Sequence, residues 1–335
     1  MLGEFIEALK NRQHLTEDQA EQALQALLLE ETPDEEIKAF LLHLAEKGET
    51  PEEITGFANG MRKMAVRIES RHEVFVDTAG TGGGRPTFNI STAAAFVIAG
   101  SGIPVAKHGN RAATSRCGSA DVLEALGVPV QQPPEVSRRA LDEIGICFLF
   151  APIHHPSMKR VARIRRELGR RTIFNLLGPL TNPAGAPFQL VGVFERPLTE
   201  KLGRVLQKLG TRRAWIVHSQ DGLDELSAAA PNRVAEVEDG RLTLFDFQRM
   251  PVAEAAPPGG SAEENAALVA AVLAGETAGA ARAVVLLNAA AAIHVAAGVP
   301  FSEAYRQAEA SLENGAALRK LNEMREFYST AGGAS

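Results

Sequence analysis

A cluster of glycines marks the first place where this sequence could do chemistry. The apolar run Val74–Val76 leads into Gly80–Gly84, and Asn89–Thr92 then reads as the first turn of a helix. Glycines let a backbone approach a ligand closely, and the free amides at a helix N-terminus favour negative charge. The segment therefore predicts an anion site, with a plain tight turn as the alternative. It is not a Walker loop, because no Gly-Lys-Ser/Thr follows, nor a dinucleotide fingerprint, because Arg85 occupies the last glycine position.

A second polar segment follows the predicted strand Ile103–Ala106. The stretch Lys107–Asp121 combines cations, amide and hydroxyl donors and glycines at a density that is unusual for a solvated loop. In open α/β folds, ligands bind at the carboxyl ends of the strands, which is where this loop is expected to lie. We interpret Asp121 as a first-turn charge on a helix capped by Ser119, and Cys117 as a packed thiol.

A pair of consecutive carboxylates, Asp224 and Glu225, comes shortly after the predicted strand Ala214–His218. Mg²⁺ prefers oxygen ligands and keeps several waters beside a phosphorylated substrate, so the pair suits this ion. The alternative is an acidic pair at the start of a helix. The adjacent His154 and His155 do not favour a zinc site, because neighbouring side chains do not readily face one ion.

The elements that must position these residues fall into two groups. Up to about residue 68 the sequence reads as short helices, with capping boxes that begin at Thr16, Thr32 and Thr50. From Val74 onward, short apolar strands alternate with helices, which predicts an α/β domain with a mostly parallel central sheet. Further strands are expected at 146–150, 189–194 and 214–218, a hairpin at 233–247 around Asp239-Gly240, and alanine-rich helices at 263–274 and 278–297.

The predicted fold class is therefore α/β, with a small N-terminal helical bundle domain and a larger α/β domain. The helical domain would comprise residues 1–69, joined by the arginine-rich helix and loop at about 160–185. The α/β domain would comprise residues 70–159 and 186–335. A chain of 335 residues is long enough to bury a large core.

Composition excludes several classes of protein. A net charge of −6 argues against broad nucleic-acid binding, and no apolar run reaches the roughly 20 residues of a membrane span. The longest candidate, Ala283–Val299, contains Asn288 and His294. No secretory signal is visible, and two cysteines allow at most one disulfide, so we expect a reduced, cytoplasmic protein.

Six motifs occur in the order that is typical of one enzyme family. They are Gly80-Thr81-Gly82-Gly83, Asn89-Ile90-Ser91-Thr92, the segment from Lys107 to Arg111, Gly118-Ser119-Ala120-Asp121, the segment from Arg170 to Pro179, and the segment from Asp221 to Ser227. As a set covering almost the whole chain, they resemble the anthranilate phosphoribosyltransferases. One motif departs from the pattern: the family usually reads Gly-Thr-Gly-Gly-Asp-Gly, whereas this loop reads Gly-Thr-Gly-Gly-Gly-Arg and is one residue shorter.

The resemblance implies a pentosyltransferase of tryptophan biosynthesis that moves the phosphoribosyl group of phosphoribosyl pyrophosphate (PRPP) to the amine of anthranilate and releases pyrophosphate. It also implies a homodimer formed through the helical domain. From the net charge and the lack of a long apolar run, we expect no nucleic-acid or membrane partner. The anthranilate amine is neutral at pH 7, so no strong general base is needed, and none is identified. The missing acidic residue removes one expected contact to the ribose substrate.

The site residues that the resemblance implies fall into three groups. PRPP would be bound by Gly80, Gly83, Gly84, Thr87, Asn89, Ser91, Thr92, Lys107, Ser115 and Ser119. Anthranilate would be bound by Gly80, His108, Asn110, Arg165 and Pro179. Mg²⁺, as two ions per subunit, would be held by Ser91, Asp224 and Glu225.

Two other functions share parts of this pattern. A pyrimidine-nucleoside phosphorylase has the same architecture but would be expected to carry a lysine loop rich in Ser-Thr-Gly-Gly instead of Lys107–Arg111. A non-catalytic relative that binds nucleic acid would be expected to be basic and to lack the Asp224–Glu225 pair, whereas this chain is acidic and keeps it. The sequence favours the transferase.

Overall fold

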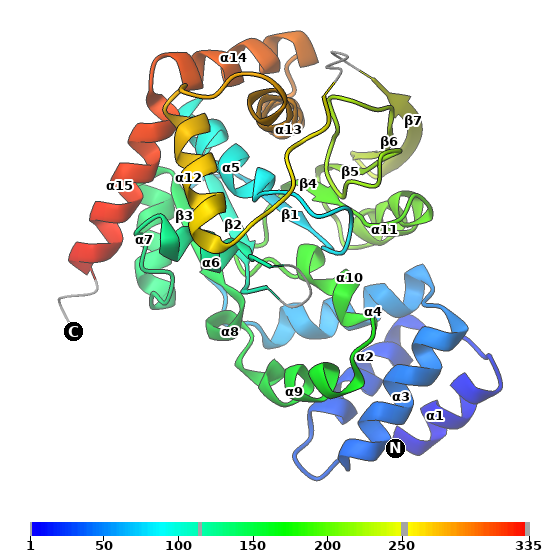
Figure 1. Ribbon diagram of the computed structural model, residues 1–335. Coiled ribbons are helices and arrows are strands. Elements are labelled where there is room, and N and C mark those ends of the chain that lie inside the picture. Colours follow the sequence, from blue (N-terminus) through cyan, green and yellow to red (C-terminus); the bar gives the residue numbers. More distant parts are fainter. Residues whose placement is uncertain (1, 113–115, 249–253, 332–335) are drawn as a thin grey trace.

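A bundle of four helices forms the N-terminal end of the molecule (Figure 1). The structure is a computed structural model and describes residues 2–112, 116–248 and 254–331. Apolar residues at helical spacing, such as Leu24, Phe40 and Phe57, are fully buried between the helices. The four helices are α1 (Leu2–Lys10), α2 (Glu17–Leu28), α3 (Asp34–Lys47) and α4 (Pro51–Met64).

Two of the three predicted capping boxes are confirmed. Thr16 with Gln19 caps α2, and Thr50 with Glu53 caps α4, each through reciprocal bonds between side chain and backbone. The prediction at Thr32 is wrong, because α3 begins after Pro33 and has no side-chain cap. The Thr32 hydroxyl instead donates to the carbonyl of Ala26 at 2.6 Å, so it closes the turn after α2.

Seven strands form one sheet in the order β3-β2-β1-β4-β5-β6-β7. β1 to β5 run parallel, and β6 and β7 add the predicted antiparallel hairpin, which turns at Asp239 and Gly240. The mostly parallel sheet is thus confirmed. The chain places β2 and β3 on one side of β1 and β4 on the other, so the crevice for a ligand lies at the carboxyl ends of β1 and β4. The strands are β1 (Val76–Gly80), β2 (Val105–Gly109), β3 (Ile146–Phe150), β4 (Phe188–Gly192), β5 (Arg213–Ser219), β6 (Asn232–Glu238) and β7 (Arg241–Phe247).

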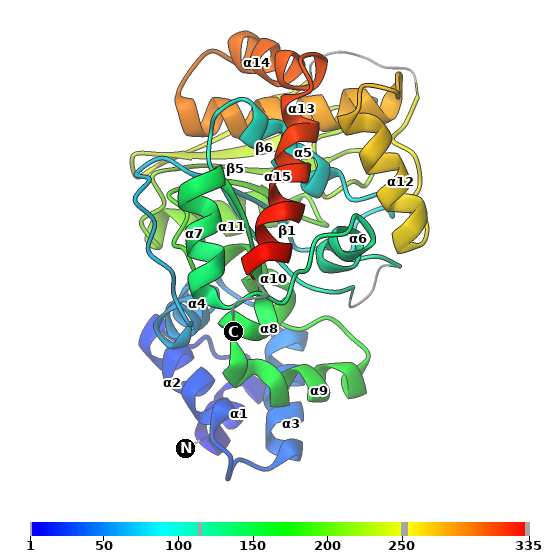
Figure 2. The same cartoon turned by 90° about the vertical axis from the view of Figure 1, so that its left-hand side faces the viewer.

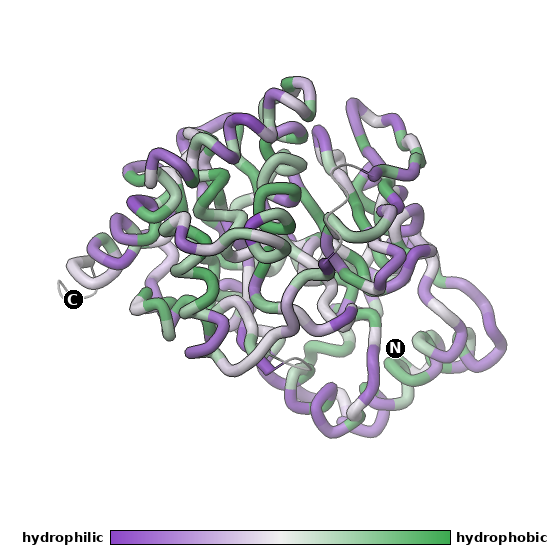
Figure 3. The backbone as a smooth tube through the Cα atoms, turned by 45° about the horizontal axis from the view of Figure 1, so that its top comes forward, coloured by the Kyte–Doolittle hydropathy of each residue, from purple (hydrophilic) through white to green (hydrophobic). Residues whose placement is uncertain are grey.

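Helices cover both faces of this sheet (Figures 1 and 2). On β5, Trp215 and Val217 belong to the core that includes α5 and α13, whereas Ala214 and Ile216 belong to the core shared with α11 and the bundle. Figure 3 shows the hydrophobic segments gathered in the interior of the molecule. The helices of this part are α5 (Ile90–Gly100), α6 (Ser119–Ala125), α7 (Pro134–Ile144), α11 (Pro197–Lys208), α12 (Ala262–Leu273), α13 (Ala280–Ala297), α14 (Phe301–Glu313) and α15 (Ala316–Ala331).

Within residues 2–112, 116–248 and 254–331, one helix, α13, is long and apolar enough to cross a membrane by length and composition. It packs against α5, α14 and β4, however, and 78% of its apolar window is buried inside the protein. In this fold α13 is therefore a core helix.

Short elements between β3 and β4 connect the sheet with the bundle. They are α8 (Ala151–His154), η1 (Pro156–Met158), α9 (Lys159–Leu168), α10 (Phe174–Leu177) and η2 (Gly178–Leu180). α9 packs against α2 and α3, and α10 packs against α4. Figures 1 and 2 both show α9 beside the bundle, at the end of the molecule opposite α14. The division into domains at residues 69, 160 and 185 stays a prediction.

Candidate active site

The glycine loop after β1 lies directly against the loop that carries the two consecutive carboxylates. Arg85 N–H donates to the carbonyl of Gly222 at 2.7 Å, and Thr81 N–H donates to the carbonyl of Gly192 at 2.9 Å. Gly82 and Gly83 both have positive φ, which glycine adopts at little cost. The loop is thus fixed between the ends of β4 and β5, and the shortened sequence still forms an ordered turn.

Two glycines are required by the closeness of this contact. A Cβ atom on Gly84 would stand 2.8 Å from both the backbone nitrogen and a carboxylate oxygen of Asp224, and 2.9 Å from the carbonyl oxygen of Gly222. A Cβ on Gly192 would stand only 1.6 Å from the carbonyl oxygen of Asp224. The loop between β5 and β6 carries Asp224 and Glu225 and is called the acidic loop below. It can approach the sheet only because Gly84 and Gly192 lack side chains.

The carboxylates of the acidic loop lie in an environment that disfavours negative charge. Burial raises the pKa of Asp224, although the Gly82 N–H bonds to this carboxylate. Burial and the neighbouring Asp224 raise the pKa of Glu225, which accepts a bond from the Ser91 N–H. Two crowded carboxylates of this kind gain stability from a bound cation.

Lys107 is the buried cation of the site. Its ammonium donates to the carbonyl of Thr78 at 2.5 Å and to the hydroxyl of Ser91 at 3.3 Å. Burial lowers the pKa of Lys107, whereas Asp77 and Glu225 act in the opposite direction. The lysine therefore joins the end of β2 to the start of α5, beside Glu225.

The first turn of α5 begins as predicted, with Asn89 at the cap position and Ile90 as the first helical residue. The Asn89 side chain does not cap the helix. Its oxygen accepts from Asn265 of α12 at 3.0 Å, and its nitrogen donates to the carbonyl of Cys117 at 3.4 Å. Asn89 thus ties the helix start to two other segments, α12 and the loop before α6.

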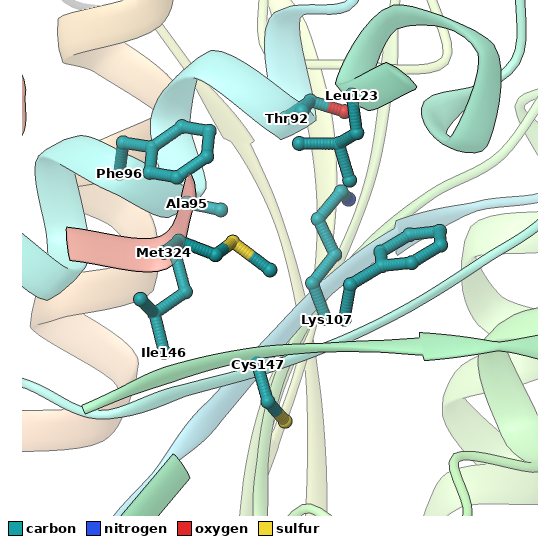
Figure 4. Close-up of a pocket in the computed structure, with 9 residues that line it drawn as sticks. Thr92, Ala95, Phe96, Lys107, Leu123, Ile146, Cys147 and Met324 are labelled. Atoms are coloured by element: carbon teal, nitrogen blue, oxygen red, sulfur yellow. The ribbon is translucent and has the colours of Figure 1, made fainter. Parts of the chain in front are cut away.

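Thr92 and Lys107 also line a small cavity behind this turn (Figure 4). The Thr92 hydroxyl is buried and has no hydrogen-bond partner among the described residues. The cavity has a volume of about 10 Å³, which is near the lower limit for a single water molecule. It is a packing space of the core and not a substrate pocket.

The loop after β2 contains two of the predicted PRPP ligands. Ser119 was expected to cap α6, but the cap position is Gly118, and Asp121 accepts bonds from the Gly118 and Ala112 amides. The Ser119 hydroxyl accepts from the Asn110 N–H at 3.2 Å and so holds the loop closed. Ser115 lies outside the described residues.

Two further predicted residues lie at the edges of the site. Thr87 is half-buried, and its carbonyl would stand 2.3 Å from a Cβ on Gly259, so the segment after β7 packs closely on it. Gly80 ends β1, where a Cβ would lie 3.5 Å from a carboxylate oxygen of Asp224. Gly80 therefore borders the contact between the loops, whereas Thr87 contacts the segment after β7.

A buried histidine joins β2 to the segment after α10. His108 Nδ1 lies 3.1 Å from the carbonyl of Gly178, which requires a proton on Nδ1 and leaves Nε2 as an acceptor. Nε2 is buried and has no hydrogen-bond partner in the part of the chain that the structure describes. Burial lowers the pKa of His108 to about 3, so the ring is neutral at pH 7. Pro179 follows and is buried, and its carbonyl accepts from Gln189 at 2.7 Å.

Asp77 is a buried carboxylate that links several segments beside His108, and it was not among the predicted site residues. One oxygen of Asp77 accepts from the His108 N–H at 3.2 Å, and the other accepts from Asn182 at 2.8 Å. Burial raises the pKa of Asp77 to about 6. Asn182 also donates to the carbonyl of Ala106, so this cluster fixes β1 and β2 to the segment after η2.

Arg165 lies on α9, half-buried, with its guanidinium 5.5 Å from the ring centre of Phe174. Its described hydrogen bond is a long one, 3.4 Å to the Asn175 side chain, and it forms no ion pair with a described residue. Burial lowers the pKa of Arg165. Its guanidinium is therefore available for an anionic ligand.

Arg171 contacts the glycine loop, although no role was predicted for it. Its guanidinium donates to the carbonyl of Gly83 at 2.8 Å and lies 3.8 Å from the ring centre of Phe194. A Cβ on Gly83 would approach this guanidinium to 2.6 Å. The motif that contains Arg171 was visible, but only the fold brings residues 83 and 171 together.

The adjacent histidines have separate structural partners. His154 Nδ1 lies 2.7 Å from the carbonyl of Val66, and His155 Nε2 lies 3.1 Å from the carbonyl of Thr181. Both rings therefore hold backbone segments where the sheet meets the bundle.

Comparison with known proteins defines the class. Residues 3–65 match the helical bundle domain of a glycosyl transferase family, and residues 72–318 match its a/b domain. The helical bundle, the α/β sheet and the glycine loop are thus parts of a two-domain glycosyl transferase.

Individual relatives narrow this class. The chain is 51% identical over 331 residues to the anthranilate phosphoribosyltransferase of Moorella thermoacetica, covering 97% of each chain. The crystal structure of anthranilate phosphoribosyltransferase from Thermus thermophilus has a TM-score of 0.89 at 39% identity and covers 97% of this chain and 99% of its own. The enzyme from Saccharomyces cerevisiae in complex with PRPP and Mg has a TM-score of 0.87 at 26% identity, with 98% of both chains covered. The chain belongs to the anthranilate phosphoribosyltransferase family.

Proposed function

We propose that this protein transfers the phosphoribosyl group of PRPP to the amine of anthranilate and releases pyrophosphate. The amine nitrogen attacks the anomeric carbon while the bond to pyrophosphate breaks, and the nitrogen then loses a proton. Positive charge develops on the ribose and negative charge on the leaving group. Such a reaction needs donors and cations at the pyrophosphate and an oriented amine, more than it needs a strong base.

The glycine loop, the first turn of α5 and Lys107 form the proposed PRPP site. The backbone amides of Gly83 and Gly84 and the helix N-terminus offer donors to the phosphates. The Lys107 ammonium, already in contact with Ser91, supplies a fixed positive charge. The remaining proposed ligands in the described part of the chain are Gly80, Thr87, Asn89, Ser91, Thr92 and Ser119.

Magnesium fits the residues that are present. Asp224 and Glu225 offer carboxylate oxygens beside Ser91, and the described residues contain no cluster of three or more His, Cys, Asp or Glu side chains. Mg²⁺ is typically bound through one or two carboxylates plus waters and substrate phosphates, which matches this limited donor set. When bound, Mg²⁺ neutralises charge on the departing pyrophosphate. We propose two ions per subunit.

The proposed anthranilate site lies between the end of β2 and the segment α9 to η2. Arg165 can bind the carboxylate with two parallel hydrogen bonds. The neutral His108 presents Nε2 as an acceptor for the amine, while Pro179 and Gly80 border the ring and Asn110 offers an exposed amide. These groups hold the amine in place and leave it unprotonated.

A homodimer through the helical domain completes the proposal. Leu29 and Val66, at the ends of α2 and α4, are 39% and 41% exposed, which a partner subunit would cover. Sedimentation at micromolar concentration tests the dimer, and a monomer would contradict it.

Cys117 and Cys147 are buried thiols, in keeping with a reduced, cytoplasmic setting.

The observation that carries the proposed function is the direct contact between the glycine loop and the acidic loop, with Lys107 beside Glu225 and Ser91. The test follows anthranilate fluorescence with purified protein, PRPP and MgCl₂. We expect fluorescence to fall only when all components are present, with one pyrophosphate released per anthranilate consumed. Unchanged anthranilate together with phosphorolysis of thymidine would overturn the proposal.

A further inference from the structure

A buried asparagine interrupts the most apolar helix of the protein. Asn288 on α13 is 0% exposed and lies within a buried stretch of valine, leucine, alanine and isoleucine. An amide in such a place costs free energy unless its polar atoms are hydrogen-bonded. Its partners therefore indicate what the residue does.

Both polar atoms of the Asn288 side chain form hydrogen bonds with one residue of the acidic loop, Leu226. Its oxygen accepts from the Leu226 N–H at 3.0 Å, and its nitrogen donates to the Leu226 carbonyl at 2.9 Å. The nitrogen also donates to the carbonyl of Val284 at 2.8 Å, within α13. The side chain thus satisfies both backbone groups of Leu226, as a neighbouring strand would, and Leu226 directly follows Glu225.

A second buried asparagine repeats this arrangement on the next residue. The oxygen of Asn232 accepts from the Ser227 N–H at 2.7 Å, and its nitrogen donates to the Ser227 carbonyl at 3.0 Å. Asn232 is 1% exposed and begins β6, so it is anchored in the sheet. Two different elements therefore hold two consecutive residues of an irregular loop.

We propose that Asn288 and Asn232 are positioning residues that fix the acidic loop so that Asp224 faces the glycine loop and Glu225 faces the start of α5. The inference rests on the proposed function, which assigns the two carboxylates to magnesium. Asp224 is confined on its other side by Gly84 and Gly192. With both sides fixed, the carboxylates hold their orientation before any ligand binds.

The principal test is Asn288→Leu, which keeps the number and branching of the side-chain heavy atoms and leaves both backbone groups of Leu226 unpaired. Loss of groups that orient metal ligands typically costs about 10- to 100-fold in metal affinity or activity. We expect the magnesium concentration for half-maximal turnover and the KM for PRPP to rise at least tenfold on this scale. The KM for anthranilate should change less than about twofold, because Arg165 and His108 are held by other segments. Asn232→Ala should show the same pattern.

The matched control is Ser311→Ala. The Ser311 hydroxyl is 1% exposed and donates to the carbonyl of Val97 at 2.8 Å, so its loss also removes a buried hydrogen bond, but between α14 and α5. We expect a lower melting temperature with unchanged magnesium dependence. If Asn288→Leu only lowers the melting temperature, as this control does, the positioning role is overturned.

A binding readout separates this inference from the proposed function. Mg²⁺ with inorganic pyrophosphate should raise the melting temperature of the wild type, and the increase should shrink in Asn288→Leu and persist in Ser311→Ala. This holds whether or not the wild type consumes anthranilate, so an inactive wild type would refute the proposed function alone. If Asn288→Leu does not fold, Asn288→Ser and Asn232→Ser take its place. Equal stabilisation in all folded variants would refute the positioning role.

Discussion

Gly84 sits where the family pattern usually has an acidic residue, and its surroundings explain the exchange. A Cβ there would collide with the backbone of Asp224 and Gly222, which cannot move without shifting the acidic loop. We expect Gly84→Asp to raise the KM for PRPP by about 5- to 150-fold, because overpacking costs about 1–3 kcal/mol. Steady-state kinetics at varied PRPP measures this effect.

The comparison variant is Gly84→Ala, which adds the Cβ without charge. If the collision is the cause, alanine should reproduce most of the loss caused by aspartate. A gain in PRPP affinity for Gly84→Asp would instead show that the chain lacks a contact it needs, and that the loops can separate.

Arg165 carries the prediction for the second substrate. It forms no ion pair with a described residue and lies remote in sequence from the PRPP loops. A hydrogen bond to a charged group contributes about 1.5–3 kcal/mol, so Arg165→Ala should raise the KM for anthranilate roughly 10- to 100-fold. The KM for PRPP should stay near the wild-type value. A rise confined to PRPP would show that the arginine is assigned to the wrong substrate.

Much of the candidate site could be predicted from residue types in the sequence. The residues that could not be predicted share a physical reason. Local sequence patterns predicted the chemistry of Gly80–Gly84, Lys107 and Asp224–Glu225. Asp77 bonds to Asn182, which is 105 positions away in the sequence. Arg171 bonds to Gly83, 88 positions away, and Asn288 bonds to Leu226, 62 positions away. Nothing near such residues in the sequence identifies those partners.

At the scale of the elements, local signals predicted helix starts only where no competing contact existed. Thr50 and Glu53 bond reciprocally as the pattern requires, whereas Thr32 turns its hydroxyl to Ala26. The strand at Val74 was predicted too early, because β1 begins at Val76, where pairing with β4 and β2 begins. Pairing partners decide strand ends, and they are not local.

The junction between η2 and the α8 region yields a prediction about pH. Burial lowers the pKa of His155 to about 4, below the roughly 6.5 of an unfolded histidine. Between these values the unfolded chain binds a proton that the folded protein does not, so stability is lost as the pH falls. At pH 5 the loss from His155 is about 2 kcal/mol relative to pH 7.

The measurement is denaturant unfolding of the wild type and His155→Gln at pH 7 and pH 5. Glutamine keeps a donor for the Thr181 carbonyl and cannot take up the proton. We expect the stability of the wild type relative to this variant to fall by about 2 kcal/mol on acidification. An unchanged difference between the two proteins would show that His155 titrates normally in the folded state.

At the scale of the whole molecule, the fold class followed from the alternation of strands and helices, but the continuity of the core did not. One hydrophobic cluster runs from Leu24 and Phe57 of the bundle through Phe174 to Ile216 of the sheet. Bundle and sheet are thus packed as neighbours across residues far apart in the chain. The C-terminal helices α14 and α15, whose burial comes from packing on α5 and α13, were also not predicted.

The central claim is that the glycine loop and the acidic loop together bind magnesium-loaded PRPP. The most direct test is turnover against magnesium concentration for the wild type and for Asp224→Asn with Glu225→Gln, with thermal melts alongside. The account predicts an unchanged or higher melting temperature, since a repelling buried pair is removed, and a collapse of turnover that excess magnesium restores only in part. Near-normal turnover with identical magnesium curves in the variant would contradict it.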